Sequence, residues 1–301
     1  MEIHSFFRLV RWRNLFLVIV LQGLVSVRLY HACNASSGGC SLDLAGILLI
    51  ILITLLVTAA GYVVNDIYDV EIDRVNRPDK MIVGNLISRK TGWFIYGAMV
   101  LAGGIAALGL NIEFNDPVYL AGYILATALL FSYSLWWKKS FLAGNLLVSF
   151  MCGVAVFVFL IPDWGSQVLQ SGTPSLLHVM LALMWFAATM TLYREIVKDM
   201  EDMQGDSVAA ARTLPIRLGY AKARIIGTFV GITVVISLAL WFFVTWQNAH
   251  FLLNAGVVSI SFMMAHTILL LGRAGKPKEL HVVSQYIKVI MLIGIIVFLI
   301  Y

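Results

Sequence analysis

The chain has 301 residues, of which 60% are hydrophobic and 12% are charged, with a formal net charge of +5 and a mean hydropathy of +0.90. Soluble globular proteins carry about 25% charged residues, so this composition excludes a soluble domain and requires lipid to cover most of the surface. We therefore predict an integral membrane protein surrounded by membrane lipid. The sequence predicts no nucleic-acid partner and identifies no protein partner.

Nine apolar runs are long enough to cross about 30 Å of hydrocarbon at about 1.5 Å per residue. They lie roughly at 15–27 with its flanks, 44–64, 92–110, 118–135, 141–161, 175–192, 225–246, 251–271 and 283–300. No small-residue cleavage site follows the first run cleanly, so we keep it as mature structure. The sequence predicts an all-α protein with nine transmembrane helices in a single domain covering residues 1–301.

Lysine and arginine concentrate in alternate loops. Arg8, Arg11 and Arg13 precede the first run among apolar residues, which is typical of an amphipathic segment at the membrane interface. Further basic residues lie within 74–90, 138–139, 194–224 and 273–278, whereas the opposite loops hold almost none. The positive-inside rule then predicts a cytoplasmic N-terminus and, after nine crossings, a C-terminus outside.

Two acidic stretches follow apolar runs. NDIYDVEIDRVNRPDK (65–80) follows the second run, and REIVKDMEDMQGD (194–206) follows the sixth. If each helix continues at about 100° per residue, the first stretch places four side chains within about 100° of arc and the second within about 60°. These are Asn65, Asp66, Asp69 and Asp73, and then Glu195, Asp199, Asp202 and Asp206. Both stretches are predicted to be cytoplasmic.

The acidic stretches lie four spans apart along the chain. This spacing predicts a four-helix unit used twice, plus one extra helix, with a site at the interface between the halves. Unit charges about 5 Å apart at an effective dielectric of about 20 repel by about 3 kcal/mol, so converging clusters need cations between them. Carboxylate oxygens select hard ions, above all Mg²⁺ where a phosphate shares the site. The alternative for each cluster is a solvated helix end after a membrane span.

Basic residues accompany both acidic stretches. Arg77 and Lys80 close the first, Arg194 and Lys198 lie within the second, and Lys138 and Lys139 follow the fourth run on the same predicted side. The ordinary positive-inside surplus explains Lys139 well but explains Arg77 and Arg194 poorly. A substrate that brings negative charge to metal ions would need such groups. The simplest ligand is a diphosphate with a long apolar tail.

These motifs carry a family resemblance. Asn65, Asp66, Asp69 and Asp73 resemble the N-D-x-x-D-x-x-x-D signature of the UbiA superfamily of intramembrane prenyltransferases, and Asn76-Arg77-Pro78 follows it as in relatives. Asp199, Asp202, Gly205 and Asp206 resemble that family's D-x-x-D-x-x-G-D motif, with Arg212-Thr213-Leu214-Pro215 downstream. The resemblance covers nearly the whole chain. It implies nine helices around a central cavity and transfer of a prenyl group from a prenyl diphosphate to a lipophilic acceptor.

The resemblance also implies residue roles. Mg²⁺ would be held through the diphosphate by the two aspartate motifs, so the expected metal residues are Asn65, Asp66, Asp69, Asp73, Asp199, Asp202 and Asp206. Among them, Asp69, Asp73, Asp199 and Asp206 are the expected catalytic residues. Arg77, Lys138, Arg194 and Lys198 would bind the substrate, and Tyr133 joins them through a loosely matched Tyr-x-x-x-Lys element.

The acceptor is a separate expectation. The two motifs look most like the branch that alkylates the hydroxyl of geranylgeranylglyceryl phosphate, and the alternative within the enzyme class is an aromatic quinone precursor. Two non-enzymatic alternatives are a cation-coupled secondary transporter and a catalytically silent lipid-binding scaffold. Transport carboxylates are expected near mid-membrane, whereas these acids lie at the ends of spans. Cys33 and Cys40 share a predicted outside loop and could pair there.

Overall fold

The computed structural model describes residues 3–34, 42–76, 78–160, 175–208, 210–246 and 251–300. Nine long helices in these ranges are apolar enough to cross a membrane, which confirms the prediction of an all-α membrane protein. They are α2 (Trp12–Asn34), α3 (Leu44–Tyr68), α5 (Arg89–Phe114), α6 (Val118–Leu135), α7 (Ala143–Phe157) continued by η3 (Val158–Leu160), α9 (Leu176–Glu201), α12 (Tyr220–Thr245), α13 (Phe251–Arg273) and α14 (Pro277–Ile300).

Shorter helices precede or connect the spans. They are α1 (Ile3–Leu9), α4 (Val70–Asn76), η1 (Pro78–Lys80), η2 (Trp137–Lys139), α10 (Met203–Val208) and α11 (Leu214–Leu218). Among them, α4, η1, η2 and α10 carry residues of the acidic and basic groups singled out in the sequence. The prediction placed the sixth span at 175–192, but α9 continues to Glu201. The reason is that Arg, Glu, Lys and Met are good helix formers, so the backbone stays helical after the apolar run ends.

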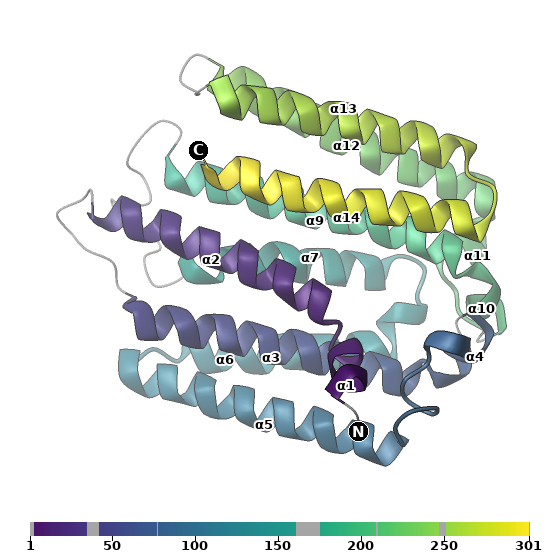
Figure 1. Cartoon of the computed structure of the whole chain (residues 1–301), viewed down its shortest axis with the longest axis horizontal. Helices are drawn as coiled ribbons and strands as arrows, with labels where there is room; N and C mark the ends of the chain where they lie inside the picture. The colour runs from purple at the N-terminus through teal and green to yellow at the C-terminus, as the bar shows by residue number, and fades with distance from the viewer. Residues whose placement is uncertain are drawn as a thin grey trace. The chain divides into compact units, whose positions relative to one another are not determined.

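The contacts divide the chain into two compact units. Unit 1 comprises Met1–Gly23, Leu42–Leu147 and Gln204–Ala211. Within it, α3 packs against both α5 and α6, and these two pack against each other (Figure 1). The side chain of Asp43 caps the start of α3 by accepting a hydrogen bond of 2.8 Å from the Gly46 amide, and Ser88 caps α5 in the same way through the Thr91 amide.

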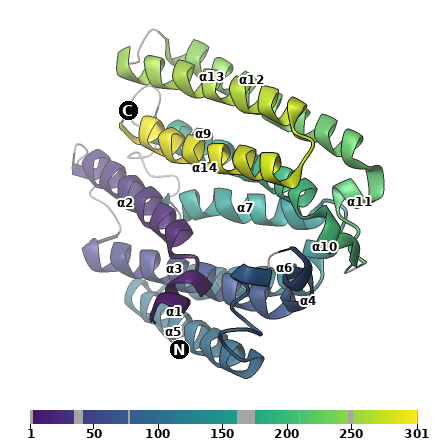
Figure 2. The same ribbon diagram turned by 45° about the vertical axis from the view of Figure 1, so that its right-hand side comes forward.

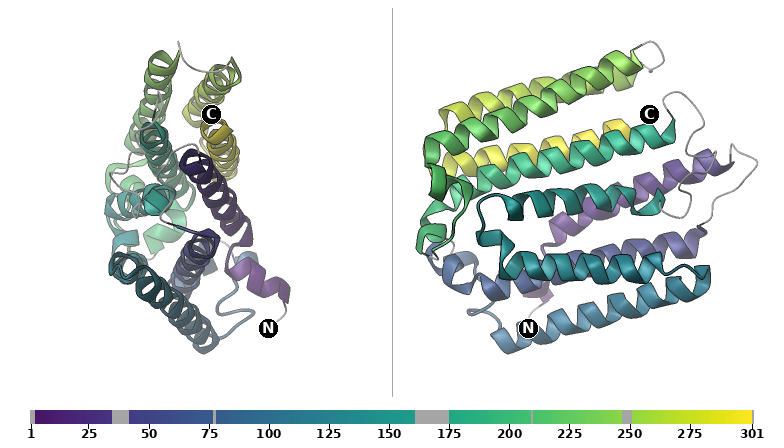
Figure 3. Two further views of the ribbon diagram at one scale, coloured as in Figure 1. Left: turned by 90° about the vertical axis from the view of Figure 1, so that its left-hand side faces the viewer. Right: turned by 180° about the vertical axis from the view of Figure 1, so that it is seen from behind.

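Unit 2 comprises Leu24–Ser41, Val148–Met203 and Arg212–Tyr301. Here α9 packs against α12 and α14, and α13 packs against α12 and α14 (Figure 2). The pair α12 and α13 runs side by side in the other views as well (Figure 3). Much of α9 is buried, including Leu183, Met190 and Ile196, so it is the central helix of this unit.

The unit boundaries fall inside α2, α7 and α10 and directly after Ala211. The grouping into two four-helix units plus one helix, the single domain and the central cavity therefore stay predictions. The possible pairing of Cys33 with Cys40 also stays a prediction, because Cys40 lies outside the described residues.

Unit 2 yields a packing prediction. A Cβ added at Gly294 on α14 would lie 2.3 Å from the ring of Phe186 on α9, and that ring is buried. We expect Gly294→Ala to destabilise the protein by about 1–3 kcal/mol, because the ring must leave its packed position. Gly97→Ala on α5 is the control, since nothing lies within 4 Å of its added Cβ. Thermal unfolding in detergent measures both, and equal midpoints for the two variants would contradict this packing.

Candidate active site

The first acidic stretch lies where α3 ends and α4 begins. Asp69 is the one non-helical residue between them, yet its amide donates to the Asn65 carbonyl at 2.9 Å and its carbonyl accepts from the Asp73 amide at 2.8 Å. The helical hydrogen-bond spacing therefore continues through the junction. This confirms the assumption on which the predicted acidic face rested.

Asn65, Asp69 and Lys138 form a buried polar cluster in unit 1. The Asn65 amide Nδ2 donates to Asp69 Oδ2 at 2.6 Å, and Lys138 Nζ donates to Asn65 Oδ1 at 3.1 Å. Lys138 Nζ also forms a close ion pair with Asp69 Oδ2. Asn65 is 8% and Asp69 4% exposed, so this contact is shielded from solvent. Burial alone would lower the pKa of the Lys138 ammonium, but the Asp69 carboxylate outweighs that effect and raises it.

A glycine allows Lys138 to reach this cluster. Lys138 lies on η2, which turns back directly before α7. A Cβ at Gly144 would lie 2.5 Å from the carbonyl oxygen of Trp137 and 3.0 Å from the Cα of Lys138, so no larger residue fits there without moving the η2 backbone. Lys139, the adjacent cation, is exposed. The structure thus assigns different surroundings to two lysines that look alike in the sequence.

Asp66 has a different partner. Arg11 Nη2 donates to Asp66 Oδ1 at 2.8 Å, and the Arg11 guanidinium lies over the Tyr62 ring at 4.7 Å from its centroid. Sequence reasoning missed Arg11 as a site residue, because Arg8, Arg11 and Arg13 form an ordinary basic group before a membrane span. No sequence signal distinguishes Arg11 from its two neighbours.

Asp73 lies on α4, one helical turn after Asp69. Burial, followed by the negative charges of Asp69 and Asp66, raises the pKa of the Asp73 carboxyl to about 6. The charges of Lys138 and Arg11 act in the opposite direction but do not cancel these effects. At Asp73, burial and the neighbouring negative charges therefore outweigh the positive charges of Lys138 and Arg11.

The second acidic stretch lies at the end of α9 and in α10. Asp199 is on the last turn of α9, Asp202 caps that helix through a 2.8 Å bond from its amide to the Lys198 carbonyl, and Asp206 is buried on α10. Asp199 and Asp202 belong to unit 2, whereas Asp206 belongs to unit 1. The second motif is thus divided between the units.

The predicted substrate-binding residues differ in their surroundings. Arg194 Nη1 bonds to Glu195 Oε1 at 2.7 Å, and its Nε is buried with no partner among the described residues. Lys198 and Tyr133 are half-buried on α9 and α6. Arg77 lies outside the described residues, and so does the side chain of Lys80. Their predicted roles stay predictions.

The described residues contain no group of three or more His, Cys, Asp or Glu side chains in a metal-binding arrangement. The donors in the first stretch are carboxylate and amide oxygens, which are the ligands of hard ions such as Mg²⁺. An ion that also takes oxygens from a diphosphate needs fewer protein ligands. The chemistry of this donor set therefore fits Mg²⁺ presented together with a phosphorylated substrate.

Comparisons with known proteins agree with this chemistry. The UbiA prenyltransferase family matches residues 29–288. The chain is 32% identical to the digeranylgeranylglyceryl phosphate synthase of Saccharolobus solfataricus, with 99% of this chain and 97% of that protein covered.

Solved structures share the fold. A structure of digeranylgeranylglyceryl phosphate synthase in membranes has a TM-score of 0.66 at 23% identity and covers 99% of this chain and 97% of that one. A UbiA homolog from Archaeoglobus fulgidus bound to GPP and Mg²⁺ has a TM-score of 0.61 at 16% identity, with 98% and 99% covered.

The raised pKa of Asp73 gives a pH prediction for the chelator-treated protein. The folded state holds this proton with a pKa of about 6 and the unfolded state with an ordinary value of 3.8. The folded state therefore binds more protons between these values, so metal-free wild type loses stability as pH rises through that window. Asp73→Asn removes this loss. We expect its unfolding midpoint to match that of wild type near pH 4 and to exceed it by about 3 °C above pH 6.

Thermal unfolding in detergent with excess chelator measures this difference. Glu113→Gln is the control, because Glu113 is an exposed carboxylate near the C-terminal end of α5. A midpoint difference for Asp73→Asn that is the same at pH 4 and pH 7 would contradict the assignment.

Proposed function

The chain belongs to the UbiA prenyltransferase family, and we propose that it transfers a prenyl group from a prenyl diphosphate to the hydroxyl of a glyceryl phosphate lipid. It is an integral membrane prenyltransferase. A full-length relative that carries the name digeranylgeranylglyceryl phosphate synthase supports the acceptor class. The substrate would be a lipid such as geranylgeranylglyceryl phosphate.

The cluster of Asn65, Asp69 and Lys138 is the observation that carries this proposal. It combines an amide from the last turn of α3, a buried carboxylate at the end of that helix and an ammonium from η2, at the end of a membrane span where polar headgroups meet the hydrocarbon. A diphosphate with an apolar tail has the same division between charge and hydrocarbon. Lys138 neutralises Asp69 in the metal-free protein and, in the proposal, turns to the diphosphate when the substrate and its ions enter.

Mg²⁺ is the proposed cofactor, because oxygen donors dominate both motifs. Six residues would hold it together with the diphosphate: Asn65, Asp69, Asp73, Asp199, Asp202 and Asp206. When bound, Mg²⁺ acts as a Lewis acid that stabilises negative charge on the diphosphate oxygens. Support for joint action of the two motifs comes from Asp206, which belongs to the same unit as the first motif.

The basic residues would stabilise the leaving group. The allylic C–O bond breaks, diphosphate leaves with the electron pair, and Lys138, Arg77, Arg194 and Lys198 neutralise the charge that develops on it. The acceptor hydroxyl oxygen then forms a C–O bond to the prenyl carbon and loses its proton to the departing diphosphate or to water. Tyr133 offers a π face to the transient carbocation.

The proposed orientation has the N-terminus and both motifs in the cytoplasm, which the distribution of lysine and arginine among the loops supports. The proposal also takes residues 1–301 as a single domain, with a central cavity that would hold the prenyl chain. The membrane then supplies the lipophilic acceptor directly to the site.

A direct assay tests this function. The purified protein is incubated with Mg²⁺, a labelled C20 prenyl diphosphate and a panel of acceptors, and the products are identified by mass. We expect an ether of geranylgeranylglyceryl phosphate and release of diphosphate. A product only with an aromatic quinone precursor would replace the proposed acceptor with the alternative one. No product with any acceptor, together with cation-driven uptake in vesicles, would favour a transporter.

Substitutions in each motif should separate catalysis from folding. We expect Asp69→Asn and Asp199→Asn to lower the transfer rate at least about 100-fold, because each removes a charge that the metal-bound diphosphate needs. Glu113→Gln is again the matched control and should keep the wild-type rate. Wild-type turnover by either motif variant would contradict the metal assignment.

A further inference from the structure

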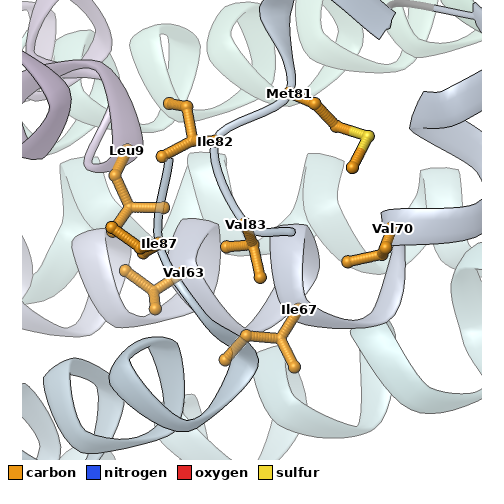
Figure 4. Packing of buried hydrophobic residues seen from close by; sticks show 8 residues of the cluster. All are labelled: Leu9, Val63, Ile67, Val70, Met81, Ile82, Val83 and Ile87. Atoms are coloured by element: carbon orange, nitrogen blue, oxygen red, sulfur yellow. The ribbon is translucent and has the colours of Figure 1, made fainter. Parts of the chain in front are cut away.

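The N-terminal segment is packed onto the first aspartate motif. Leu9, at the end of α1, is 0% exposed and joins a hydrophobic cluster with Val63 and Ile67 of α3, Val70 of α4 and the connection that contains Met81, Ile82, Val83 and Ile87 (Figure 4). All of these residues belong to unit 1. The sequence predicted only an interfacial amphipathic segment here, whereas Leu9 is part of the core beside the motif.

Arg11 lies two residues after the buried Leu9. Its backbone adopts a left-handed conformation with φ of 53°, which non-glycine residues rarely adopt, and the chain then enters α2. The side chain pairs with Asp66 and lies over Tyr62, one turn earlier on α3. Asn14 Nδ2 donates to the Tyr62 hydroxyl at 3.2 Å. The α1–α2 junction and the first turn of α2 therefore contact two successive turns of α3, the helix that carries Asn65 and ends at Asp69.

We propose that Arg11 is a positioning residue for the first aspartate motif. Its ion pair keeps Asp66 from binding the metal ion and fixes the end of α3, where Asn65 and Asp69 lie. This inference rests on the proposed Mg²⁺-dependent function. It replaces the sequence-based expectation that Asp66 is itself a metal ligand.

The charge of Arg11 explains why this pair persists. A guanidinium does not lose its proton in proteins, so Arg11 needs a permanent partner. The Asp66 side chain is 14% exposed and that of Arg11 is 37% exposed, so water supplies only part of the compensation. If Asp66 moved to a divalent ion, a fixed cation would remain unpaired beside that ion. Lys138, which holds Asp69, differs because an ammonium can turn to a phosphate.

The pKa of Arg11 agrees with this geometry. Burial would lower the pKa of the guanidinium, but the Asp66 carboxylate, the Tyr62 phenol group, the hydrogen bond to Asp66 and the Asp69 carboxylate together raise it above its ordinary value. Arg11 therefore keeps its positive charge throughout the physiological pH range.

A double-mutant cycle in the full-length protein tests the proposal without relying on turnover. The variants are Arg11→Met, Asp66→Asn and the double variant, with Asp69→Asn as the metal-ligand reference. The first readout is the thermal unfolding midpoint with excess chelator. The second is Mn²⁺ affinity by EPR in the presence of inorganic pyrophosphate, which serves as the diphosphate probe.

We expect both single variants to weaken Mn²⁺ binding by about tenfold, because each removes the same supporting pair. The double variant should bind Mn²⁺ no more weakly than the weaker-binding single variant, and the unfolding midpoints should show the same non-additivity. Asp69→Asn should weaken Mn²⁺ binding at least about 100-fold. Arg11→Lys keeps the charge and should restore part of the affinity lost in Arg11→Met. Arg13→Met is the matched control, because Arg13 is exposed and should change neither readout.

The opposite results would overturn the positioning role. If Asp66 is a metal ligand, Asp66→Asn matches Asp69→Asn in Mn²⁺ affinity and the effects multiply in the double variant. Should Arg11→Met fail to fold, the comparison of Asp66→Asn with Asp69→Asn still decides the question. The proposed function fails on a different result. Wild-type protein that binds Mn²⁺ and pyrophosphate but transfers no prenyl group would contradict prenyl transfer. The positioning role of Arg11 would then still be decided by the Mn²⁺ affinities and unfolding midpoints of the double-mutant cycle.

Discussion

Charge compensation at the end of α3 is the constraint on which this site depends. Two carboxylates there, Asp66 and Asp69, are largely shielded from water, and each is paired with a cation from a different segment. Arg11 comes from the N-terminal junction and Lys138 from the connection before α7. Removing either cation would leave a poorly solvated negative charge, which is costly in a low-dielectric environment. The motif therefore ties three separate segments of unit 1 together.

The two cations are not equivalent. Arg11 is also held over Tyr62, so its guanidinium is fixed from two sides. Lys138 ends in a compact ammonium on a flexible stem, and its donors can turn toward another oxygen. Under the proposed function, the site alternates between a metal-free state and a state containing a diphosphate, and it would use one permanent and one exchangeable cation. The pairing seen in unit 1 provides both.

The sequence was sufficient for the spans and insufficient for these pairings. Lipid requires long apolar helices, so hydropathy identified the nine spans found in the described part of the chain, and the helical spacing of Asn65, Asp69 and Asp73 gave the correct local geometry. The sequence did not show that Arg11 turns toward α3, because that depends on a left-handed residue between α1 and α2. Nor did the sequence show that Lys138 reaches Asn65 and Asp69 while Lys139 is exposed. Hydropathy and periodicity describe single elements, whereas ion pairs depend on how connections fold back.

The position of the charges along the helices also bears on what the protein does. Asn65 and Asp66 lie in the last turn of α3, and Asp199 lies in the last turn of α9, whose buried middle is apolar. A transporter that carries cations across the membrane needs its carboxylates near mid-membrane, where the apolar barrier is. Charges at helix ends are instead placed to bind a ligand whose headgroup stays at the interface while its tail enters the hydrocarbon. The connections that carry Arg11 and Lys138 are available only at that end, so the polar chemistry and its supporting cations must lie there together.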